Sequence, residues 1–323
     1  MIFLTGAAGF IGRHVVRSLV DAGTPFRVLL SRPNADFEAA FPGAETVVGD
    51  LLDPEVLDRG LAGARAVIHL ASKNVDTDGQ GFERVNVEGT RQLLARAIAA
   101  GVERLVYVSS VGVYGHGAHL RADETTPLHP DTPFSRSKAA AEGLLLDARD
   151  RLDVVILRHR FVHGDGDRAV IPRLLKAAQK YPFWISGGRA RMSLVWAPDL
   201  ARVARGFALA KWTAETESPI YHVTDGRETT YREVITALCD RLGKRPPRVS
   251  IPFPVLYWPV RLREKLLGID PEVSKASITS IRLELVAQDN HFSSRKLESL
   301  VGDWRPTPFV DALAEDFEGY LSS

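Results

Sequence analysis

The stretch TGAAGFIGRHVV, residues 5–16, places three glycines between an apolar run and a helical pattern. Gly6, Gly9 and Gly12 allow a tight turn and a backbone without Cβ atoms directly before the helix. An anionic group can then approach the free N–H groups and the positive end of the helix dipole. The spacing G-x-x-G-x-x-G differs from the G-x-G-x-x-G pattern, but its position between strand and helix predicts a dinucleotide-binding turn. The alternative is a plain strand–helix turn.

Short apolar runs alternate with helical patterns through the first half of the chain. The runs expected to form strands are residues 2–6, 26–31, 45–50, 66–72, 104–110 and 154–158. Helical patterns lie between them, for example at 13–23, 85–101 and 137–150. Strands that are apolar on both faces and joined by helices indicate a parallel sheet covered on both sides. The predicted fold class is therefore α/β, with a doubly wound parallel Rossmann sheet.

The alternation of strand and helix patterns ends after about residue 160, where segments that contain several prolines mix with helices such as 230–243. A smaller, mixed C-terminal domain that supplies a substrate pocket is expected there. One or both of the apolar runs 193–196 and 221–224 are expected to return to the main sheet. The predicted division assigns residues 1–160 plus about 191–224 to a dinucleotide-binding Rossmann domain, and about 161–190 plus 225–323 to a substrate-binding domain.

The composition is that of an ordinary soluble globular protein. Of 323 residues, 45% are hydrophobic and 25% are charged, and the formal net charge of +1 does not favour nucleic-acid binding. The one cysteine, Cys239, excludes an internal disulfide and a cysteine-based metal site, and is expected to be a buried helix residue. Without a signal peptide or a long apolar run, the sequence predicts a cytoplasmic protein with no membrane span.

The residues after the second predicted strand bear on the choice of cofactor. NAD-binding Rossmann domains carry an acidic residue about 20 residues after the glycine turn, where it holds the ribose 2′-hydroxyl. This chain has Ser31 and Arg32 there instead. Because a guanidinium suits a 2′-phosphate, the sequence predicts NADP(H) over NAD(H), with NAD still possible. The alternative is that Arg32 is only an exposed loop residue.

Several further motifs occur in one order along the chain and together resemble a single family. They are GDLLD (49–53), HLAS (69–72), NVEGT (86–90), VSSVGVYG (108–115), LRHRFVHGDGD (157–167) and SLVWAPDLA (193–201). With the glycine turn they resemble the extended short-chain dehydrogenase/reductases, which include nucleotide-sugar epimerases and dehydratases and 3β-hydroxysteroid-dehydrogenase-like enzymes. The closing segment 290–321 is similar to that of the last branch.

The resemblance implies hydride transfer between a nicotinamide cofactor and a carbinol or carbonyl carbon of a small-molecule substrate. It places cofactor contacts at the glycine turn, the strand ends and the sheet edge. With Ser31 and Arg32, the expected cofactor-binding residues are Gly6, Gly9, Phe10, Ile11, Gly12, Asp50, Leu51, Leu70, Ala71, Ser72, Asn86, Lys138, His159 and Val162.

In that family a tyrosine moves the hydroxyl proton, a lysine four residues later lowers the tyrosine pKa, and a serine or threonine binds the substrate oxygen. A spacing of four places the first two on one helix face, where an ammonium can stabilise a phenolate. By position Ser110 is the serine and Lys138 the lysine, but the tyrosine position holds Phe134. Tyr114 is a less favoured substitute, because the family's Tyr-Gly pair is a separate feature.

Phe134 leaves three interpretations open. The chain could be a deliberate tyrosine-to-phenylalanine variant made to hold substrate without turnover. Phenylalanine could instead be native, in a protein that does other chemistry or only binds its cofactor. In the third interpretation a native enzyme uses another acid, such as water or a hydroxyl held by Ser110. The first is favoured, because Ser110, Lys138 and the glycine turn are intact and only one hydroxyl is missing.

The substrate is expected to be apolar. Sugar-nucleotide members of the family usually carry an asparagine shortly after the Leu-Arg pair, near the place of Phe161 in this chain, and the C-terminal half is rich in Trp, Phe, Pro and Leu. An apolar secondary alcohol and its ketone are the predicted substrate pair. A nucleotide-sugar epimerase or dehydratase, and an NADP-binding protein without catalysis, are the alternatives. The expected substrate contacts are Lys73, Asn74, Ser110, Val111, Phe161 and Arg191.

Segment 248–269 is apolar, aromatic and basic. It could be a membrane-surface helix, but a pocket wall or lid is favoured because its prolines oppose a long regular helix. Family members commonly dimerise through two helices, and the apolar faces of 91–100 and 139–146 predict a homodimer.

Three histidines are assigned no catalytic role. His69 is expected to be structural, and His116 and His119 are expected to be surface residues. No metal site is predicted, because further ligands near them cannot be located in the sequence.

Overall fold

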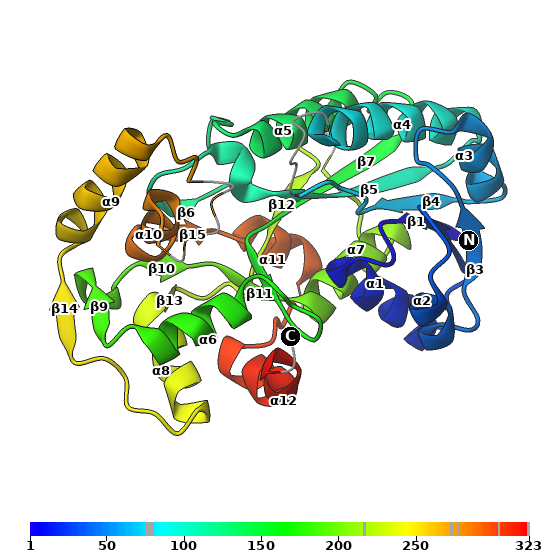
Figure 1. Ribbon diagram of the computed structural model, residues 1–323. Helices are drawn as coiled ribbons and strands as arrows, with labels where there is room; N and C mark the ends of the chain where they lie inside the picture. The colour runs from blue at the N-terminus through cyan, green and yellow to red at the C-terminus, as the bar shows by residue number, and fades with distance from the viewer. Residues whose placement is uncertain are drawn as a thin grey trace.

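A parallel sheet forms the centre of the molecule (Figure 1). The computed structural model describes residues 1–74, 81–215, 218–271, 274, 276, 278–302 and 304–321. Within them the sheet has seven strands in the order β12-β7-β5-β4-β1-β2-β3, all parallel. The strands are β1 (Ile2–Thr5), β2 (Phe26–Leu30), β3 (Glu45–Val48), β4 (Ala66–His69), β5 (Arg104–Ser110), β7 (Asp153–His159) and β12 (Ile220–Val223).

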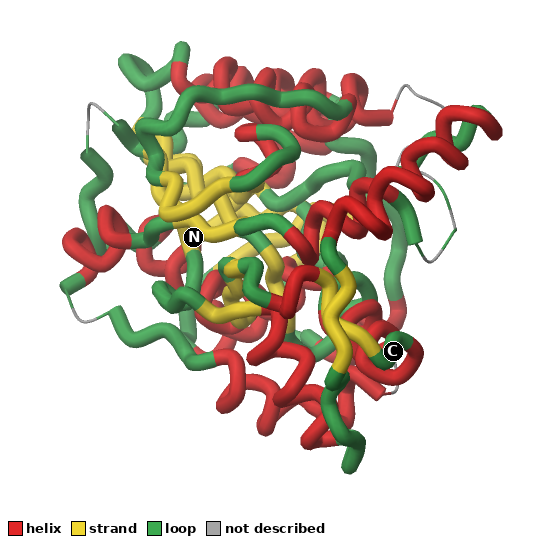
Figure 2. Tube along the Cα trace, turned by 90° about the vertical axis from the view of Figure 1, so that its left-hand side faces the viewer, coloured by secondary structure: helices red, strands yellow, loops and turns green. Residues whose placement is uncertain are grey.

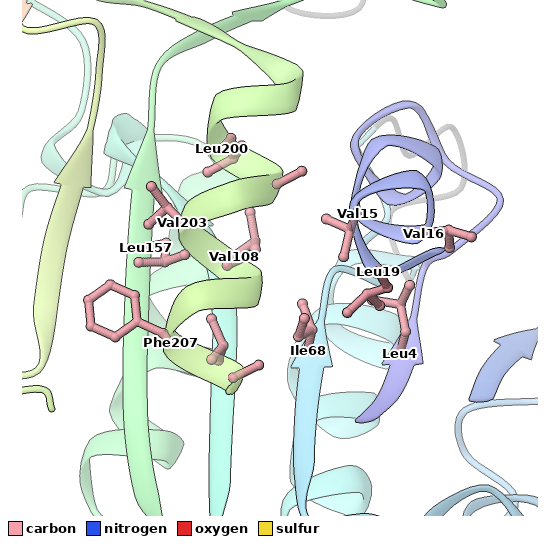
Figure 3. Close-up of a cluster of buried hydrophobic side chains, with 14 of the residues drawn as sticks. Leu4, Val15, Val16, Leu19, Ile68, Val108, Leu157, Leu200, Val203 and Phe207 are labelled. Carbon is pink, nitrogen blue, oxygen red and sulfur yellow. The ribbon is translucent and has the colours of Figure 1, made fainter. Parts of the chain in front are cut away.

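Helices cover both faces of this sheet (Figures 1 and 2). One face carries α1 (Phe10–Asp21), α2 (Ala35–Ala40) and α7 (Ala197–Ala208), and the other carries α3 (Pro54–Leu61), α4 (Gly89–Ala99) and α5 (Pro133–Leu146). In Figure 3, Val15 and Leu19 of α1 and Val203 of α7 lie among residues of β1, β4, β5 and β7. Each fully buried aliphatic side chain of this kind contributes about 1.5–3 kcal/mol, so both helix layers are held firmly to the sheet.

Local sequence signals set the start of the helix that carries the candidate catalytic residues. The Thr132 side chain accepts from the N–H of Ser135, the Ser135 side chain accepts in return from the N–H of Thr132, and Pro133 fills the first turn. A capping box followed by proline fixes a helix start. For this reason α5 begins at Pro133 rather than at residue 137, and it ends at Leu146. The predicted helix at 85–101 begins as the π-helix η1 (Phe82–Glu88), which continues into α4.

Besides α7, the second half of the chain has six α-helices within the described residues, and together with β6 from the first half it forms smaller sheets. A mixed four-stranded sheet has the order β13-β10-β15-β6, and two parallel pairs are β11–β8 and β14–β9. The strands are β6 (His119–Ala122), β8 (Phe161–His163), β9 (Phe183–Ile185), β10 (Arg191–Met192), β11 (Leu194–Trp196), β13 (Thr229–Thr230), β14 (Val249–Ile251) and β15 (Asn290–Phe292). The helices are α6 (Ile171–Lys180), α8 (Tyr231–Arg241), α9 (Phe253–Leu267), α10 (Ser280–Ala287), α11 (Arg295–Val301) and α12 (Phe309–Leu321), with the short 3₁₀ turns η2 (Val111–Tyr114) and η3 (Ser186–Gly188).

Most of the expected architecture is confirmed. The six predicted strands form the main sheet, and the run at 221–224 joins it as β12 beside β7. The run at 193–196 does not join the sheet: as β11 it pairs with β8, which follows β7 directly. Cys239 is buried on α8, as expected. The domain boundaries remain a prediction.

The prolines of 248–269 were expected to prevent a long regular amphipathic helix, but they do not prevent a helix of 15 residues. Phe253–Leu267 form the helix α9, with Pro259 inside it. Pro254 lies in the first turn, where an N–H group would have no intrahelical partner, so it costs little there. Of the helices that the structure describes, none is long and apolar enough to cross a bilayer.

Candidate active site

The glycine turn between β1 and α1 forms a cradle without side chains. Gly6 has a φ of +77°, and a Cβ built on it would lie 2.6 Å from the backbone nitrogen of Ala71. A Cβ on Gly12 would lie 2.1 Å from the carbonyl oxygen of Gly6. In its first turn, all of which is described, α1 has neither a side-chain cap nor an acidic residue. The N–H groups and dipole are left for a phosphate, and the residues present therefore fit a dinucleotide. Phe10 and Ile11 are partly buried in this turn.

The loop after β2 offers positive charge at the expected ribose end of the site. Ser31 and Arg32 follow β2 and are exposed. Arg13, on α1, lies with its guanidinium carbon 5.7 Å from the centre of the Phe37 ring on α2, the helix that follows this loop. Arg13 was not among the predicted cofactor-binding residues, whereas Arg32 was.

The residues after β3 and β4 line the sheet edge beside the turn. Leu51 is buried, while the exposed Asp50 carboxylate accepts from Arg84 at 2.8 Å. Leu70, Ala71 and Ser72 are partly buried, and Lys73 and Asn74 are exposed.

Asn86 ties this sheet edge to α5. Its Oδ1 accepts from the backbone N–H of Lys73 at 2.7 Å, and its Nδ2 donates to the Lys73 carbonyl at 3.1 Å and to Ser137 Oγ at 2.9 Å. Because the amide is buried and bonded on both sides, it fixes the distance between the end of β4 and the helix that carries Lys138.

β5 and α5 bring together the residues at the expected catalytic positions. Ser110 ends β5, and its Oγ accepts from the Gly112 N–H at 3.1 Å. Lys138 is buried, and its Nζ donates at 2.9 Å to the carbonyl of Val108, two residues before Ser110. The Nζ also lies 4.2 Å from the centre of the Tyr107 ring. The ammonium is therefore held at the end of the strand that carries the serine. Val111, the residue after Ser110, is buried.

The environment of Lys138 changes its proton affinity. Burial lowers the pKa of Lys138 to about 7, and the Glu142 carboxylate opposes this change. Phe134 lies one turn before Lys138, partly buried, with its ring centre 5.9 Å from that of Phe82 in an edge-to-face contact. The side chain one helical turn before Lys138 therefore carries no hydroxyl.

Tyr114 belongs to a buried polar network instead. Its hydroxyl lies 2.6 Å from Arg158 Nη1 and 2.6 Å from His222 Nε2. Arg158 forms a salt bridge of 2.5 Å with Glu142, and both side chains are almost inaccessible. Burial raises the pKa of Tyr114 to about 12, although Arg158 acts in the opposite direction. A phenol held in this way is poorly suited to exchange protons near neutral pH, which disfavours Tyr114 as a substitute acid.

The end of β7 lies directly beside Ser110. His159 is the register partner of Ser110 in the adjacent strand. Burial lowers the pKa of His159 to about 4, and the positive charge of Lys138 acts in the same direction, so the imidazole is neutral at pH 7. Two residues further on, Phe161 begins β8, in which Val162 is buried.

A cavity of about 720 Å³ is lined by Phe161 and by residues of α6, β9, α9 and α10, and its lining does not include Ser110, Lys138 or His159. Most of its lining is apolar, and among the described lining residues the charged ones are all basic: Arg173, Lys176, Lys180 and Arg282. The remaining lining residues are Ala169, Val170, Leu174, Ala177, Gln179, Tyr181, Phe183, Ile185, Met192, Tyr231, Leu256, Ile278, Leu283, Leu285 and Val286. Arg191 is not in the lining and forms ion pairs with Glu228 at 3.0 Å and Asp289 at 3.6 Å.

His69, His116 and His119, which were assigned no catalytic role, each contact other side chains. His69 is buried, with ring nitrogens 2.6 Å from Thr5 Oγ1 and 3.0 Å from Thr90 Oγ1, which supports a structural role. His116 and His119 are partly exposed: His116 bonds to an aspartate, and His119 packs on aromatic rings. The described residues contain no group of side chains suited to hold a metal ion.

Comparison with known sequences identifies the family. The pattern of the NAD dependent epimerase/dehydratase family matches residues 2–223. The chain belongs to this family. Together with the dehydrogenases and reductases among its relatives, the match makes the chain an NAD(P)-dependent short-chain dehydrogenase/reductase, as the motifs predicted.

Curated relatives of this family member act on several substrates. It is 34% identical over 272 residues to a 4-hydroxy-2-methyl-3-oxo-4-farnesyl-3,4-dihydroquinoline-1-oxide ketoreductase of Stigmatella aurantiaca, covering 82% of this chain and 80% of the relative. It is 31% identical over 284 residues to a 2-alkyl-3-oxoalkanoate reductase of Stenotrophomonas maltophilia, with 81% and 84% covered. It is 29% identical over 353 residues to a 3beta-hydroxysteroid-dehydrogenase/decarboxylase of Arabidopsis thaliana, with 98% and 79% covered.

Solved structures agree with the fold. The crystal structure of gox2253 matches all of this chain and 98% of the other at a TM-score of 0.79 and 26% identity. A complex of MoeE5 with UDP-glucose and NAD matches 99% of this chain and 98% of the other at a TM-score of 0.73 and 25% identity. The family thus includes oxidoreductases and epimerases, while the cytoplasmic location, the homodimer and the preference for NADP remain predictions.

Sequence reasoning missed the charged residues behind the site. Glu142 lies one turn after Lys138, and Arg158 lies in the Leu-Arg pair, but their contact joins α5 to β7. The helical spacing was a usable signal for Glu142. The basic residues of the cavity gave no such signal, because they come from separate helices.

Proposed function

We propose that this family member transfers hydride between NADP(H) and an apolar ketone or secondary alcohol, and that Phe134 limits its turnover. The observation that supports the proposal is the apolar cavity of about 720 Å³, whose lining includes Phe161, two residues after His159, the register partner of Ser110. The farnesyl, alkyl and steroid groups in the names of the relatives support an apolar substrate.

The residues of the chain divide the chemistry between them. Ser110 Oγ binds the substrate oxygen, and the buried Lys138, with a pKa of about 7, provides positive charge mainly below neutral pH. The nicotinamide, when bound, supplies or accepts the hydride at the substrate carbon. The oxygen gains or loses a proton at the same time, and Phe134 cannot carry that proton. Water or the Ser110 hydroxyl must do so, at a cost of about 10²–10⁴-fold in rate.

The basic residues of the cavity refine the expected substrate. Arg173 and Arg282 lie close enough for each charge to affect the other, and burial together with Arg173 lowers the pKa of Arg282. An anion between them relieves this repulsion. We therefore expect a substrate that combines a long apolar chain with an acidic group, such as a carboxylate.

NADP(H) is the proposed cofactor because Arg32 follows β2, where NAD-binding domains carry an acidic residue, and because Arg13 packs against Phe37 on the helix after that loop. Isothermal titration with NADPH and NADH tests this choice. Tighter binding of NADH would overturn it.

The test of the reaction compares the chain with its Phe134→Tyr variant. NADPH oxidation is followed with alkyl 3-oxo acids and with neutral alkyl ketones, and the variant is expected to gain about 10²–10⁴-fold in kcat. Phe134→Leu, which keeps an apolar side chain, is the matched control and should gain nothing. If Phe134→Tyr shows no gain while Ser110→Ala abolishes activity, the chain uses another acid. Turnover by neither chain, with tight NADPH binding, would establish a binding protein instead. Tighter binding of UDP than of the apolar ketones would favour a nucleotide-sugar enzyme.

A further inference from the structure

The helix α9 turns a stripe of large apolar side chains away from the protein. Val255, Trp258, Leu262 and Leu266 have exposed fractions of 61%, 66%, 57% and 74%. Their spacing of three, four and four residues places them on one helix face. Figure 1 shows α9 at the edge of the molecule, far from the main sheet, and Figure 2 views the molecule from that side.

The opposite face of α9 holds the helix in this orientation. Glu264 is buried, and its carboxylate accepts from the N–H of Ser280 at 2.8 Å and from the Ser280 hydroxyl at 2.6 Å. These bonds cap the start of α10, and Leu256 on the same side of α9 lines the cavity. The stripe therefore faces outward because the inner face is already bonded.

Basic residues flank the stripe. Residues 244–269 contain six Lys or Arg residues and one acidic residue, Glu264, which is the buried one. On a helical projection Arg261 and Lys265 lie on one side of the stripe and Arg263 on the other, and all three are exposed. Arg261 also lies 3.8 Å from the Glu264 carboxylate, and Arg263 donates to the Ile278 carbonyl at 3.4 Å. The whole chain has a net charge of only +1, so this concentration of positive charge is local.

We propose that α9 is a membrane-surface helix that docks this protein on bilayers containing anionic lipid. An outward apolar face with basic residues on both sides is the arrangement in which a helix lies in the bilayer interface, with its side chains between the headgroups. A second copy of the chain is a poorer occupant, because two such faces would bring their basic flanks together.

Docking of α9 on a bilayer would also bring the cavity close to apolar substrates dissolved in the membrane. Because Leu256 belongs to the cavity lining and to the inner side of α9, docking brings the cavity to the membrane surface. This second step rests on the proposed function, whereas lipid binding by α9 does not.

The experiment measures binding of the purified full chain to vesicles. Co-sedimentation is compared for phosphatidylcholine vesicles and for a three-to-one mixture of phosphatidylcholine and phosphatidylglycerol. Binding to the mixed vesicles is expected, and it should weaken as salt is raised. Brominated lipid should quench Trp258, which is exposed, whereas Trp184, Trp196, Trp212 and Trp304 are buried or partly buried.

Two variants separate the apolar and the charged contributions. Leu262→Ser with Leu266→Ser should weaken vesicle binding more than tenfold, and Arg263→Gln should weaken it about fivefold. Leu120→Ser with Leu209→Ser, which alters leucines elsewhere that are 51% and 48% exposed, is the matched control and should bind normally. Circular dichroism checks that each variant is folded.

Some results would overturn the proposal. Equal binding to both vesicle types, unchanged binding by the α9 variants, or no quenching of Trp258 would each do so. A concentration-dependent dimer that the α9 variant abolishes, without vesicle binding, would assign the stripe to a second copy. NADPH turnover does not enter this test, so a failure of the proposed function would leave its result unchanged.

Discussion

The salt bridge between Glu142 and Arg158 yields the most demanding prediction. Both side chains are almost inaccessible, and the carboxylate accepts from Arg158 Nε at 3.1 and 3.2 Å and from Nη2 at 2.5 Å. Arg158→Met would remove all of these bonds and leave a buried carboxylate with Ser109 as its remaining partner in the network. Breaking a buried pair in this way costs about 3–5 kcal/mol.

A variant that replaces both residues of the pair shows whether the loss of stability comes from an unpaired buried charge or from lost contacts. Glu142→Leu with Arg158→Met replaces both charges by apolar side chains, so no ion is left unpaired, and its stability should return close to that of the parent. With an unfolding entropy of about 2 cal/mol/K per residue, the single variant should melt about 4–7 °C lower.

Urea unfolding and thermal melting, both followed by circular dichroism, measure these changes. Arg65→Met, which breaks the exposed pair of Arg65 and Glu103, is the control and should cause no resolvable change. A double variant as unstable as the single one would refute the reasoning, since the cost would then come from lost packing rather than from an unpaired charge.

Four further predictions concern the cofactor, the substrate and pH. Gly12→Ala should weaken NADPH binding more than tenfold by fluorescence titration, because its Cβ would lie 2.1 Å from a carbonyl oxygen, whereas Gly143→Ala, with nothing within 4 Å, should not. Arg32→Ala should weaken NADPH binding about tenfold and leave NADH binding unchanged in the same titration. Arg282→Gln should raise KM about tenfold for an alkyl 3-oxo acid but not for a neutral ketone in steady-state assays. Burial lowers the pKa of Lys138 to about 7, so between pH 7 and about 10.5 the unfolded chain binds one proton more than the folded chain. The free energy of unfolding of the cofactor-free protein should therefore rise with pH across this window. Urea titrations measure this rise, and Lys138→Met should remove it.

The parts of the fold that follow from local signals could be predicted from the sequence. The glycine turn, the apolar strands and the helices between them depend on neighbouring residues, and six main-sheet strands lie where the pattern places them. The start of α5 could also have been predicted, because Thr132 and Ser135 form a capping box and Pro133 lies in the first turn. The helical pattern alone placed this start later, at residue 137.

Features made by residues far apart in the chain could not be predicted. The run at 193–196 pairs with β8 because β12 occupies the sheet edge beside β7, and nothing within those four residues reports this choice. The cavity could not be predicted either, because its lining residues are spread from Phe161 to Val286 without a regular spacing in the sequence. Asn86 is an intermediate case: its motif is local, while its bonds reach Lys73 and Ser137.

The strand β6 limits how this chain could be recombined with its relatives. Residues His119–Ala122 come from the first half but pair with β15 near the C-terminus, and Phe292 stacks on Tyr114 at 5.6 Å between ring centres. A chimera that exchanges only the C-terminal half would pair β6 with a foreign β15 and place a foreign side chain against Tyr114. The loop that carries β6 should therefore be exchanged together with the C-terminal half.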